Sequence, residues 1–342
     1  HWLPPDNFQE SPEAAAHRTS PTNIGMALAG TLAAADFGYL SPGRLAARIR
    51  NTFETLDRLE RYRGHFYNWY DTRSLKPLHP LYVSTVDSGN LTGMLIVLRA
   101  GLAESIDAPV LPPAWRDGLA DTADVLLEEL HAAARRRSLD AAAIQRARRA
   151  VQAWRGALAD APPSLRDSLR LLDTLAADAA ALADTLAPDP ETAFWRDALQ
   201  AQLDDFAGEL RRFAPWADDD PSALPDAARR ELDTLPALRA LATLHQRRDA
   251  LLPPGTPGES QWADHFRLAS ERAAERIAAL QALRDQCAEL ADNDLDFLYD
   301  AKRHLLSIGY NLESHVRDPG YYDLLASECR LASFVGVARG QL

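Results

Sequence analysis

The chain has 342 residues, 46% of them hydrophobic, so it can bury a core large enough for one big domain or two ordinary ones. Its net charge of −12 repels polyphosphate and anionic lipid, which argues against nucleic acid and membrane surfaces as partners. Cys287 and Cys329 belong to no metal-binding spacing, so neither a disulfide framework nor structural zinc is expected. The first residue is His1 rather than Met, from which we expect a segment of a longer protein.

The first part of the chain predicts helices joined by aromatic and polar loops. Two Ser-Pro pairs, at 20–21 and 41–42, are typical of an N-cap followed by the first helical residue. The second of these helices repeats apolar residues at steps of three and four, and Gly64 is expected to end it. The repeated residues are Leu45, Ile49, Phe53, Leu56 and Leu59. A third helix is expected to begin at Asp87 or Ser88.

Composition divides the chain into three zones, 1–106, 107–291 and 292–342. Ala, Leu, Arg and Asp dominate the middle zone, which predicts long antiparallel helices with their charged residues on a solvated face. Ser164 with Asp167 resembles a capping box in this zone. Because the outer zones share aromatic and polar loops, we expect the middle zone to be a helical insertion between two parts of one domain.

The last zone predicts a short extended stretch, a turn and a final helix. Residues 304–312 favour a β-hairpin-like stretch, and the Asp-Pro-Gly sequence at 318–320 favours a turn. A helix is expected from about Tyr321 to Ala338. The fold class that follows is all-α, with a long helical insertion and one short β-hairpin-like stretch.

Glu328 falls in the middle of an apolar stripe on this final predicted helix. The stripe comprises Tyr321, Leu324, Leu325, Leu331, Ala332 and Val335. Burial disfavours the charged form of a carboxyl, so Glu328 is expected to hold a proton near neutrality, as a general acid requires. The alternative is a structural role, in which Glu328 is tied to a buried Arg or to a helix N-terminus.

An aromatic loop follows Gly64 directly. It places aromatic rings beside amides, carboxylates and an arginine, the groups that recognise a pyranose with apolar C–H faces and a rim of hydroxyls. Its candidate substrate contacts are His65, Tyr67, Asn68, Trp69, Asp71 and Arg73. A well-packed connection without a ligand is the alternative. Asp87 is a further candidate, since its position predicts an N-cap and an N-cap carboxylate can also face a cleft.

The sequence lacks the motifs of several other catalytic classes. It contains no GxSxG elbow, GxxxxGK loop, GxGxxG fingerprint or HExxH pair. The histidines at positions 17, 65 and 304 form no metal-binding pattern. Neither a metal nor a cofactor is therefore expected.

Several long motifs resemble the glycoamylase-like domain of cyclic β-1,2-glucan synthases, and they occur in the same order. They are residues 1–9, 17–25, 64–73, 86–91, 307–310 and 321–328. The resemblance covers the two outer zones, whereas the middle zone matches only loosely. It implies the first part of an (α/α)6 toroid related to bacterial endo-β-1,2-glucanases, in a domain that continues beyond Leu342.

The resemblance also implies roles for individual residues. Glu328 matches the general acid/base of the family, while Asp71, Asp87 and the aromatic loop match its substrate cleft. The remaining cleft candidates are Tyr321, Tyr322 and Asp323. A partner carboxylate acting as nucleophile is expected on later helices, so the isolated chain is expected to lack a complete active site.

In this family a glycosyltransferase unit extends the glucan from UDP-glucose, and a phosphorylase-like region adjusts its length. The implied partners are β-1,2-glucan and these neighbouring domains, in a protein associated with the cytoplasmic side of the bacterial inner membrane. Closing a β-linked chain into a β-linked ring preserves the anomeric configuration, which implies a retaining transglycosylation. The alternatives left open are a β-1,2-glucan endo-hydrolase and a non-catalytic helical module that binds glucan or docks against neighbouring domains.

Overall fold

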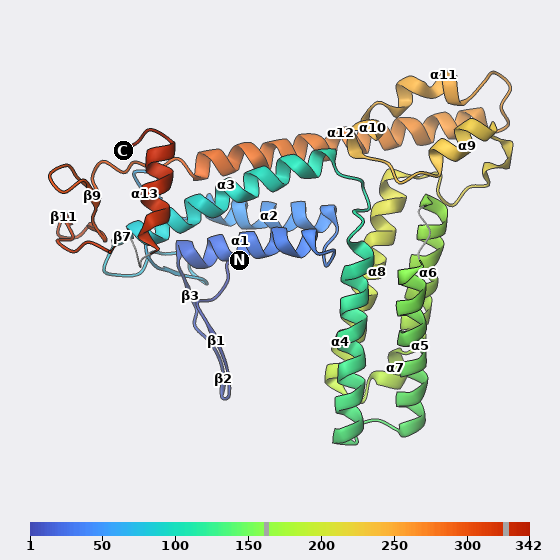
Figure 1. Cartoon of the computed structure of the whole chain (residues 1–342), viewed down its shortest axis with the longest axis horizontal. Helices are drawn as coiled ribbons and strands as arrows, with labels where there is room; N and C mark the ends of the chain where they lie inside the picture. Colours follow the sequence, from blue (N-terminus) through green and yellow to red (C-terminus); the bar gives the residue numbers. More distant parts are fainter. Residues whose placement is uncertain (161–163, 324–327) are drawn as a thin grey trace. The chain divides into compact units, whose positions relative to one another are not determined.

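The computed structural model describes residues 1–160, 164–323 and 328–342. It is mostly helical with a few short strands, so the all-α fold class is confirmed at that level (Figure 1). The chain forms two compact units, each described below by itself. Unit 1 comprises His1–Ala33, Ala46–Glu104 and Leu280–Leu342, and unit 2 comprises Ala34–Leu45 and Ser105–Ala279.

The two Ser-Pro pairs start helices, as predicted. Helix α1 spans Pro21–Asp36 and helix α2 spans Pro42–Leu56. Ser20 Oγ accepts a hydrogen bond from the backbone N–H of Asn23 at 3.2 Å, and Ser41 Oγ accepts one from Arg44 at 3.1 Å. A Ser hydroxyl at the N-cap satisfies an amide that has no partner inside the helix, which is why these pairs mark the starts.

Helix α2 ends eight residues before Gly64, so the predicted end was wrong. The amides of Arg58 and Leu59 bond to carbonyls three residues back, at 3.1 and 3.0 Å, which tightens the last turn and closes the helix after Leu56. Gly64, with φ of +87°, instead forms the turn between strands β4 (Arg61–Tyr62) and β5 (His65–Phe66). Glycine adopts this left-handed conformation at no steric cost.

Helix α3 spans Thr85–Asp107 and packs on α1. Its N-cap is Ser84, whose Oγ accepts from the amide of Asp87 at 3.2 Å. The helix therefore begins two residues before the predicted start, and Asp87 is the third helical residue rather than the cap. Close packing with α1 is visible at Gly101, where a Cβ would stand 2.6 Å from Leu32 Cδ1.

Short antiparallel strands surround the helix ends of unit 1. Strands β1 (Phe8–Glu10) and β2 (Glu13–Ala15) form a hairpin that projects from the unit in Figure 1. The other strands, besides β4 and β5, are β3 (Arg18–Thr19), β6 (Tyr70–Asp71), β7 (Tyr82–Ser84), β8 (Tyr299–Asp300), β9 (Leu305–Leu306), β10 (Gly309–Asn311) and β11 (Val316–Arg317). β3 pairs with β6, β8 with β9, and β7, β10 and β11 form a sheet of order β11-β10-β7. The predicted extended stretch 304–312 thus contains two strands, of which β9 pairs with β8 and β10 lies between β7 and β11.

The C-terminal segment differs from the predicted continuous helix. The turn at 318–320 is present, with Gly320 N–H donating to Asp318 Oδ1 at 2.9 Å. Residues 321–323 are not helical, and helix α13 spans Cys329–Ala338. The first turns of the predicted helix are therefore wrong where the structure describes them, and residues 324–327 lie outside the described ranges.

Unit 2 is built around long antiparallel helices, as its composition predicted (Figure 1). Its long helices are α4 (Trp115–Arg136), α5 (Ala141–Ala159), α6 (Leu165–Ala181) and α8 (Pro190–Phe213). Shorter ones are α7 (Ala183–Leu186), α9 (Asp226–Leu232), α10 (Leu238–Ala242), α11 (Arg248–Leu251), and the 3₁₀ turns Pro221–Ala223 and Leu244–Arg247. Helix α12 spans Glu259–Leu290.

The predicted capping box of α6 is confirmed. Ser164 Oγ accepts from the amide of Asp167 at 3.1 Å and donates to its carboxylate at 3.0 Å. Among the described residues, no helix combines the length and the apolar character that crossing a bilayer would require.

Candidate active site

The first turns of α3 pack closely against the start of α13. A Cβ added to Gly89 would stand 2.6 Å from Ala332 Cβ and 2.8 Å from its backbone, and one added to Gly93 would stand 2.7 Å from Leu331 Cδ2. A side chain at either position would collide with α13, so the two helices can approach this closely only because glycine has no Cβ. The two glycines therefore bring the start of α13, and the residue before it, against the part of α3 that carries Asp87.

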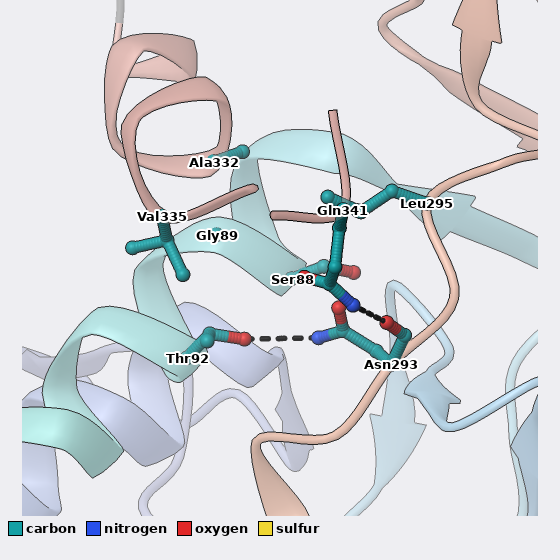
Figure 2. A pocket seen from close by; sticks show the side chains of 8 residues that line it. All are labelled: Ser88, Gly89, Thr92, Asn293, Leu295, Ala332, Val335 and Gln341. Carbon is teal, nitrogen blue, oxygen red and sulfur yellow. Dashed lines mark hydrogen bonds between the residues drawn. The ribbon is translucent and has the colours of Figure 1, made fainter. Parts of the chain in front are cut away.

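Asn293, in the loop that follows α12, is hydrogen-bonded both to α3 and to the segment after α13, as Figure 2 shows. Asn293 Nδ2 donates to Thr92 Oγ1 of α3 at 2.9 Å, and Gln341 Nε2 donates to the carbonyl of Asn293 at 2.6 Å. The cavity between these residues measures about 10 Å³, which is room for one water and not for a sugar ring.

Glu328 directly precedes α13, and its side chain is exposed. The prediction that it lies buried in an apolar stripe was wrong, because that stripe required a helix running continuously from Tyr321. Its Oε2 instead accepts a hydrogen bond from Asn90 Nδ2 of α3 at 3.3 Å. Glu328 is therefore positioned by a polar contact at the surface and not by apolar packing.

Asp87 lies at the centre of the polar network that reaches Glu328. Thr22 Oγ1 of α1 donates to Asp87 Oδ1 at 2.6 Å, and Asn90 Nδ2 donates to Thr22 Oγ1 at 3.2 Å. With its amide oriented to satisfy both neighbours, Asn68 Nδ2 donates to Asp87 Oδ2 at 2.8 Å. Both oxygens of Asp87 thus accept hydrogen bonds, and since Ser84 caps the helix, Asp87 is left to face the network.

The indole of Trp69 extends the network away from Asp87. Its Nε1 donates to Asn68 Oδ1 at 3.1 Å, and the guanidinium of Arg18 lies over the ring at 4.4 Å from the centroid. Arg18 is in turn held by Asp6, with a 2.9 Å ion pair. The half-buried ring is therefore fixed by its edge and by one face, which suits a platform for stacking a sugar.

Tyr322 borders both carboxylates. Burial is the main cause that raises the pKa of its hydroxyl, and the negative charges of Asp87, Asp318 and Glu328 raise it further. The neighbouring hydroxyl of Tyr82 donates to Asp318 Oδ2 at 3.4 Å. A phenol with this environment keeps its proton over the physiological range and can donate to a sugar oxygen.

Two aromatic-loop candidates are buried with their polar atoms engaged. His65 bonds to Ser88 Oγ at 2.8 Å and to the carbonyl of Asp294 at 2.6 Å, and burial lowers its pKa. The Tyr67 hydroxyl donates to Glu60 at 3.3 Å, and the ring is 4% exposed. The polar atoms of both side chains are thus engaged within the protein, His65 with α3 through Ser88 and Tyr67 with Glu60.

Asp71 and Arg73 form a turn at the surface. Asp71 Oδ1 accepts from the amides of Ser74 at 2.7 Å and Arg73 at 3.0 Å. These bonds, that of Ser74 first, lower the pKa of Asp71 to about 2. The carboxylate is thus engaged by its own loop, while the guanidinium of Arg73 is largely exposed.

Tyr321 and Asp323 are the remaining candidates from the sequence. Tyr321 donates to Asp300 Oδ2 at 2.5 Å, a bond that is the main cause raising its pKa, and Arg303 lies over its ring at 4.7 Å. Asp323 is exposed. The structure therefore gathers four of the predicted site residues into one hydrogen-bonded network, which are Asn68, Trp69, Asp87 and Glu328, and places Tyr322 where it senses the charges of Asp87 and Glu328.

Thr22, Asn90 and Arg18 belong to this network and were not singled out from the sequence. One signal was present for Asn90, which follows Asp87 by three residues and so shares its helix face. Thr22 and Arg18 lie in the motif 17–25, but no spacing linked them to Asp87, because they reach the site from another helix and strand. Within the described ranges, no three metal-ligating side chains cluster.

Comparison with known proteins supports the resemblance found in the motifs. No family model matches the chain. The chain is 32% identical over 348 aligned positions to the cyclic β-(1,2)-glucan synthase NdvB of Rhizobium meliloti. That alignment covers 100% of this chain and 10% of the synthase, so the chain spans about a tenth of that relative's length. The similarity to one part of such a synthase, predicted from six motifs, is confirmed.

Proposed function

Because this chain is homologous along its whole length to one segment of the cyclic β-1,2-glucan synthases, we propose that it closes linear β-1,2-glucan into a ring by retaining transglycosylation. The domain is proposed to be the glycoamylase-like one, the first part of an (α/α)6 toroid, with residues 107–291 as an insertion. The observation that carries this proposal is the polar network joining Glu328 to Asp87 within residues of the shared motifs.

Retention requires two displacements. In the first, Glu328 protonates the departing glycosidic oxygen. At the same time a carboxylate nucleophile, proposed to lie outside this chain, attacks the anomeric carbon and forms a covalent glycosyl-enzyme. In the second, Glu328 removes the proton from the incoming 2-hydroxyl of the chain's far end. The site must then favour that hydroxyl over water, which is a matter of holding both glucan ends in place.

Because Glu328 is exposed, the bound substrate would have to shield it from water. A general acid works best when water is excluded from it, and the surface position of Glu328 supplies no such exclusion in the free protein. We propose that bound glucan covers Glu328, with Trp69 stacking one sugar and Tyr322 donating to a sugar oxygen. Asp87 then holds Asn68 and Thr22 in place along the wall of the site.

The test is Glu328→Gln in the full-length protein, with Glu54→Gln as the control because Glu54 is an exposed acid on α2 of the same unit. Cyclic products from the parent, loss of cyclisation in Glu328→Gln and normal activity of the control are expected. Near-normal cyclisation by Glu328→Gln would remove this residue from the mechanism. Linear products of inverted configuration would instead identify an endo-hydrolase, and glucan binding without turnover would identify a binding module.

The wider setting is also a proposal. The aligned relative is far longer than this chain, which leaves room in such a protein for the glycosyltransferase and phosphorylase-like domains that would supply and trim the glucan. We propose that this domain receives its linear substrate from them, at the cytoplasmic side of the bacterial inner membrane. Separating the domains should then leave glucan extension intact and remove ring closure.

A further inference from the structure

The side chain of Asn90 donates hydrogen bonds to both Thr22 and Glu328. Its Nδ2 lies 3.2 Å from Thr22 Oγ1 and 3.3 Å from Glu328 Oε2. We propose that Asn90 is a positioning residue that dictates which oxygen of Glu328 carries the transferred proton. This inference rests on the proposed function, in which Glu328 is the general acid/base.

The orientation of the Asn90 amide follows from Asp87. A hydroxyl has one proton, and Thr22 gives its proton to Asp87 Oδ1 at 2.6 Å. Thr22 Oγ1 can therefore only accept from Asn90, which forces the NH₂ group, and not the carbonyl oxygen, to face Thr22 and Glu328. Asp87 thus sets the direction of every hydrogen bond between itself and Glu328.

This direction distinguishes the two oxygens of Glu328. An amide NH₂ only donates, so Oε2 accepts from Asn90 at 3.3 Å, and an oxygen that accepts such a bond binds a proton less readily than its partner oxygen. The acidic proton is consequently placed on Oε1. Without Asn90 the proton could sit on either oxygen, and the side chain, exposed as it is, could rotate among several conformers.

The chemical step balances with the proton on Oε1. The Oε1–H bond breaks as the proton joins the leaving glycosidic oxygen, which keeps the electron pair of the broken C1–O bond, while the nucleophilic carboxylate bonds to C1. In the second displacement, the 2-hydroxyl oxygen bonds to C1, the carboxylate leaves, and Oε1 takes the hydroxyl proton. Oε2 keeps its bond to Asn90 throughout.

The experiment compares two leaving groups in the full-length protein. Natural β-1,2-glucan needs a proton on its leaving oxygen, whereas a nitrophenyl β-1,2-gluco-oligosaccharide leaves as a stable phenolate and needs little acid assistance. Asn90→Ala should lower kcat on glucan roughly tenfold or more, part of the 10²–10⁴ that a general acid contributes. Glycosyl-enzyme formation from the nitrophenyl substrate should change less than about threefold, since only acid assistance is affected.

Two further variants separate positioning from packing. Asn90→Asp keeps the size of the side chain and removes the donor, so it should lose at least as much activity on glucan as Asn90→Ala. Asn51→Ala, on the half-buried face of α2, is the matched control and should behave as the parent. Equal losses on both substrates, or an active Asn90→Asp, would overturn the positioning role.

Comparing Asn90→Ala with Glu328→Gln tells a failure of the positioning role apart from a failure of the proposed function. If Glu328→Gln abolishes cyclisation and Asn90→Ala does not reduce it, the positioning role alone is lost. If Glu328→Gln stays active, the acid/base assignment fails, and the role of Asn90 fails with it.

Discussion

Gly89 of α3 and Ala332 of α13 are in direct backbone contact. A Cβ on Gly89 would lie 2.8 Å from both Cα and N of Ala332, closer than real Cβ atoms approach other atoms. Glu328 lies four residues before Ala332, and Asn90 directly follows Gly89. This contact therefore determines whether the amide of Asn90 can reach Glu328.

Replacing Gly89 by Ala is expected to displace α13. Overpacking of a tight contact typically costs about 1–3 kcal/mol, so amide hydrogen exchange in α13 should speed up and cyclisation should fall. Gly30→Ala is the control, because nothing lies within 4 Å of its added Cβ, and removing a helix glycine should stabilise α1 by about 0.5–1 kcal/mol. Unchanged exchange in α13 of Gly89→Ala would show that the contact can relax at no cost.

Trp69→Ala is expected to weaken glucan binding by about 3–10-fold, since stacking contacts of an aromatic face contribute on the order of 1 kcal/mol. Trp69→Phe should recover part of this loss, because it restores a ring but not the indole donor to Asn68. Titration calorimetry with linear β-1,2-glucan measures both. Trp2→Ala serves as the control, an exposed tryptophan in unit 1 outside the network. Equal affinity of Trp69→Ala and the parent would remove Trp69 as a platform.

Asp87→Asn is expected to lower the pKa of the Tyr322 hydroxyl. Burial, the largest cause of the raised pKa, stays, but the negative charge of Asp87, the next largest cause, is removed, so the phenol ionises at a lower pH. Absorbance titration, with Tyr322→Phe subtracted, follows this group. The same substitution should reduce cyclisation, because Thr22 loses its charged acceptor. An unchanged Tyr322 titration would show that the two side chains do not sense each other in solution.

Unit 2 is expected to lose stability at low pH through Asp189. Burial raises the pKa of this carboxyl, but bonds from Ser138, Thr192 and Arg136 outweigh it and lower the pKa from 3.8 to about 2. A depressed pKa stabilises the fold above the unfolded value, so the contribution of about 2 kcal/mol present at neutral pH should fade as pH drops from about 4 to 2.

Denaturant unfolding of the parent and of Asp189→Asn across this range measures that contribution. Asn keeps the N-cap acceptor for α8 but cannot ionise, so its stability should lack this part of the pH dependence. Parallel curves for the two proteins would show that Asp189 does not control the acid response.

Much of the secondary structure was predictable because its determinants are local. Ser20, Ser41 and Ser164 cap helices through atoms three residues away, and apolar residues at steps of three and four marked the buried face of α2. The end of α2 was mispredicted because a tight turn interrupts a continuing apolar pattern, and the start of α13 was mispredicted because residues 321–323 are not helical. An apolar stripe is compatible with a helix but does not require one, which is why Glu328 was wrongly expected to be buried.

The sequence alone determined the helix caps, the all-α character and the relation to cyclic β-1,2-glucan synthases, since each depends on residues close together in the chain or on motifs in a set order. The tertiary structure alone decided which candidates meet. Two contacts bring the candidates together. Gly89 and Gly93 let α13 pack directly on the backbone of α3, and Thr22 of α1 donates to Asp87. The candidates concerned are Asn68, Asp87, Tyr322 and Glu328. Such encounters depend on how helices pack over long sequence separations, and no local pattern encodes that geometry.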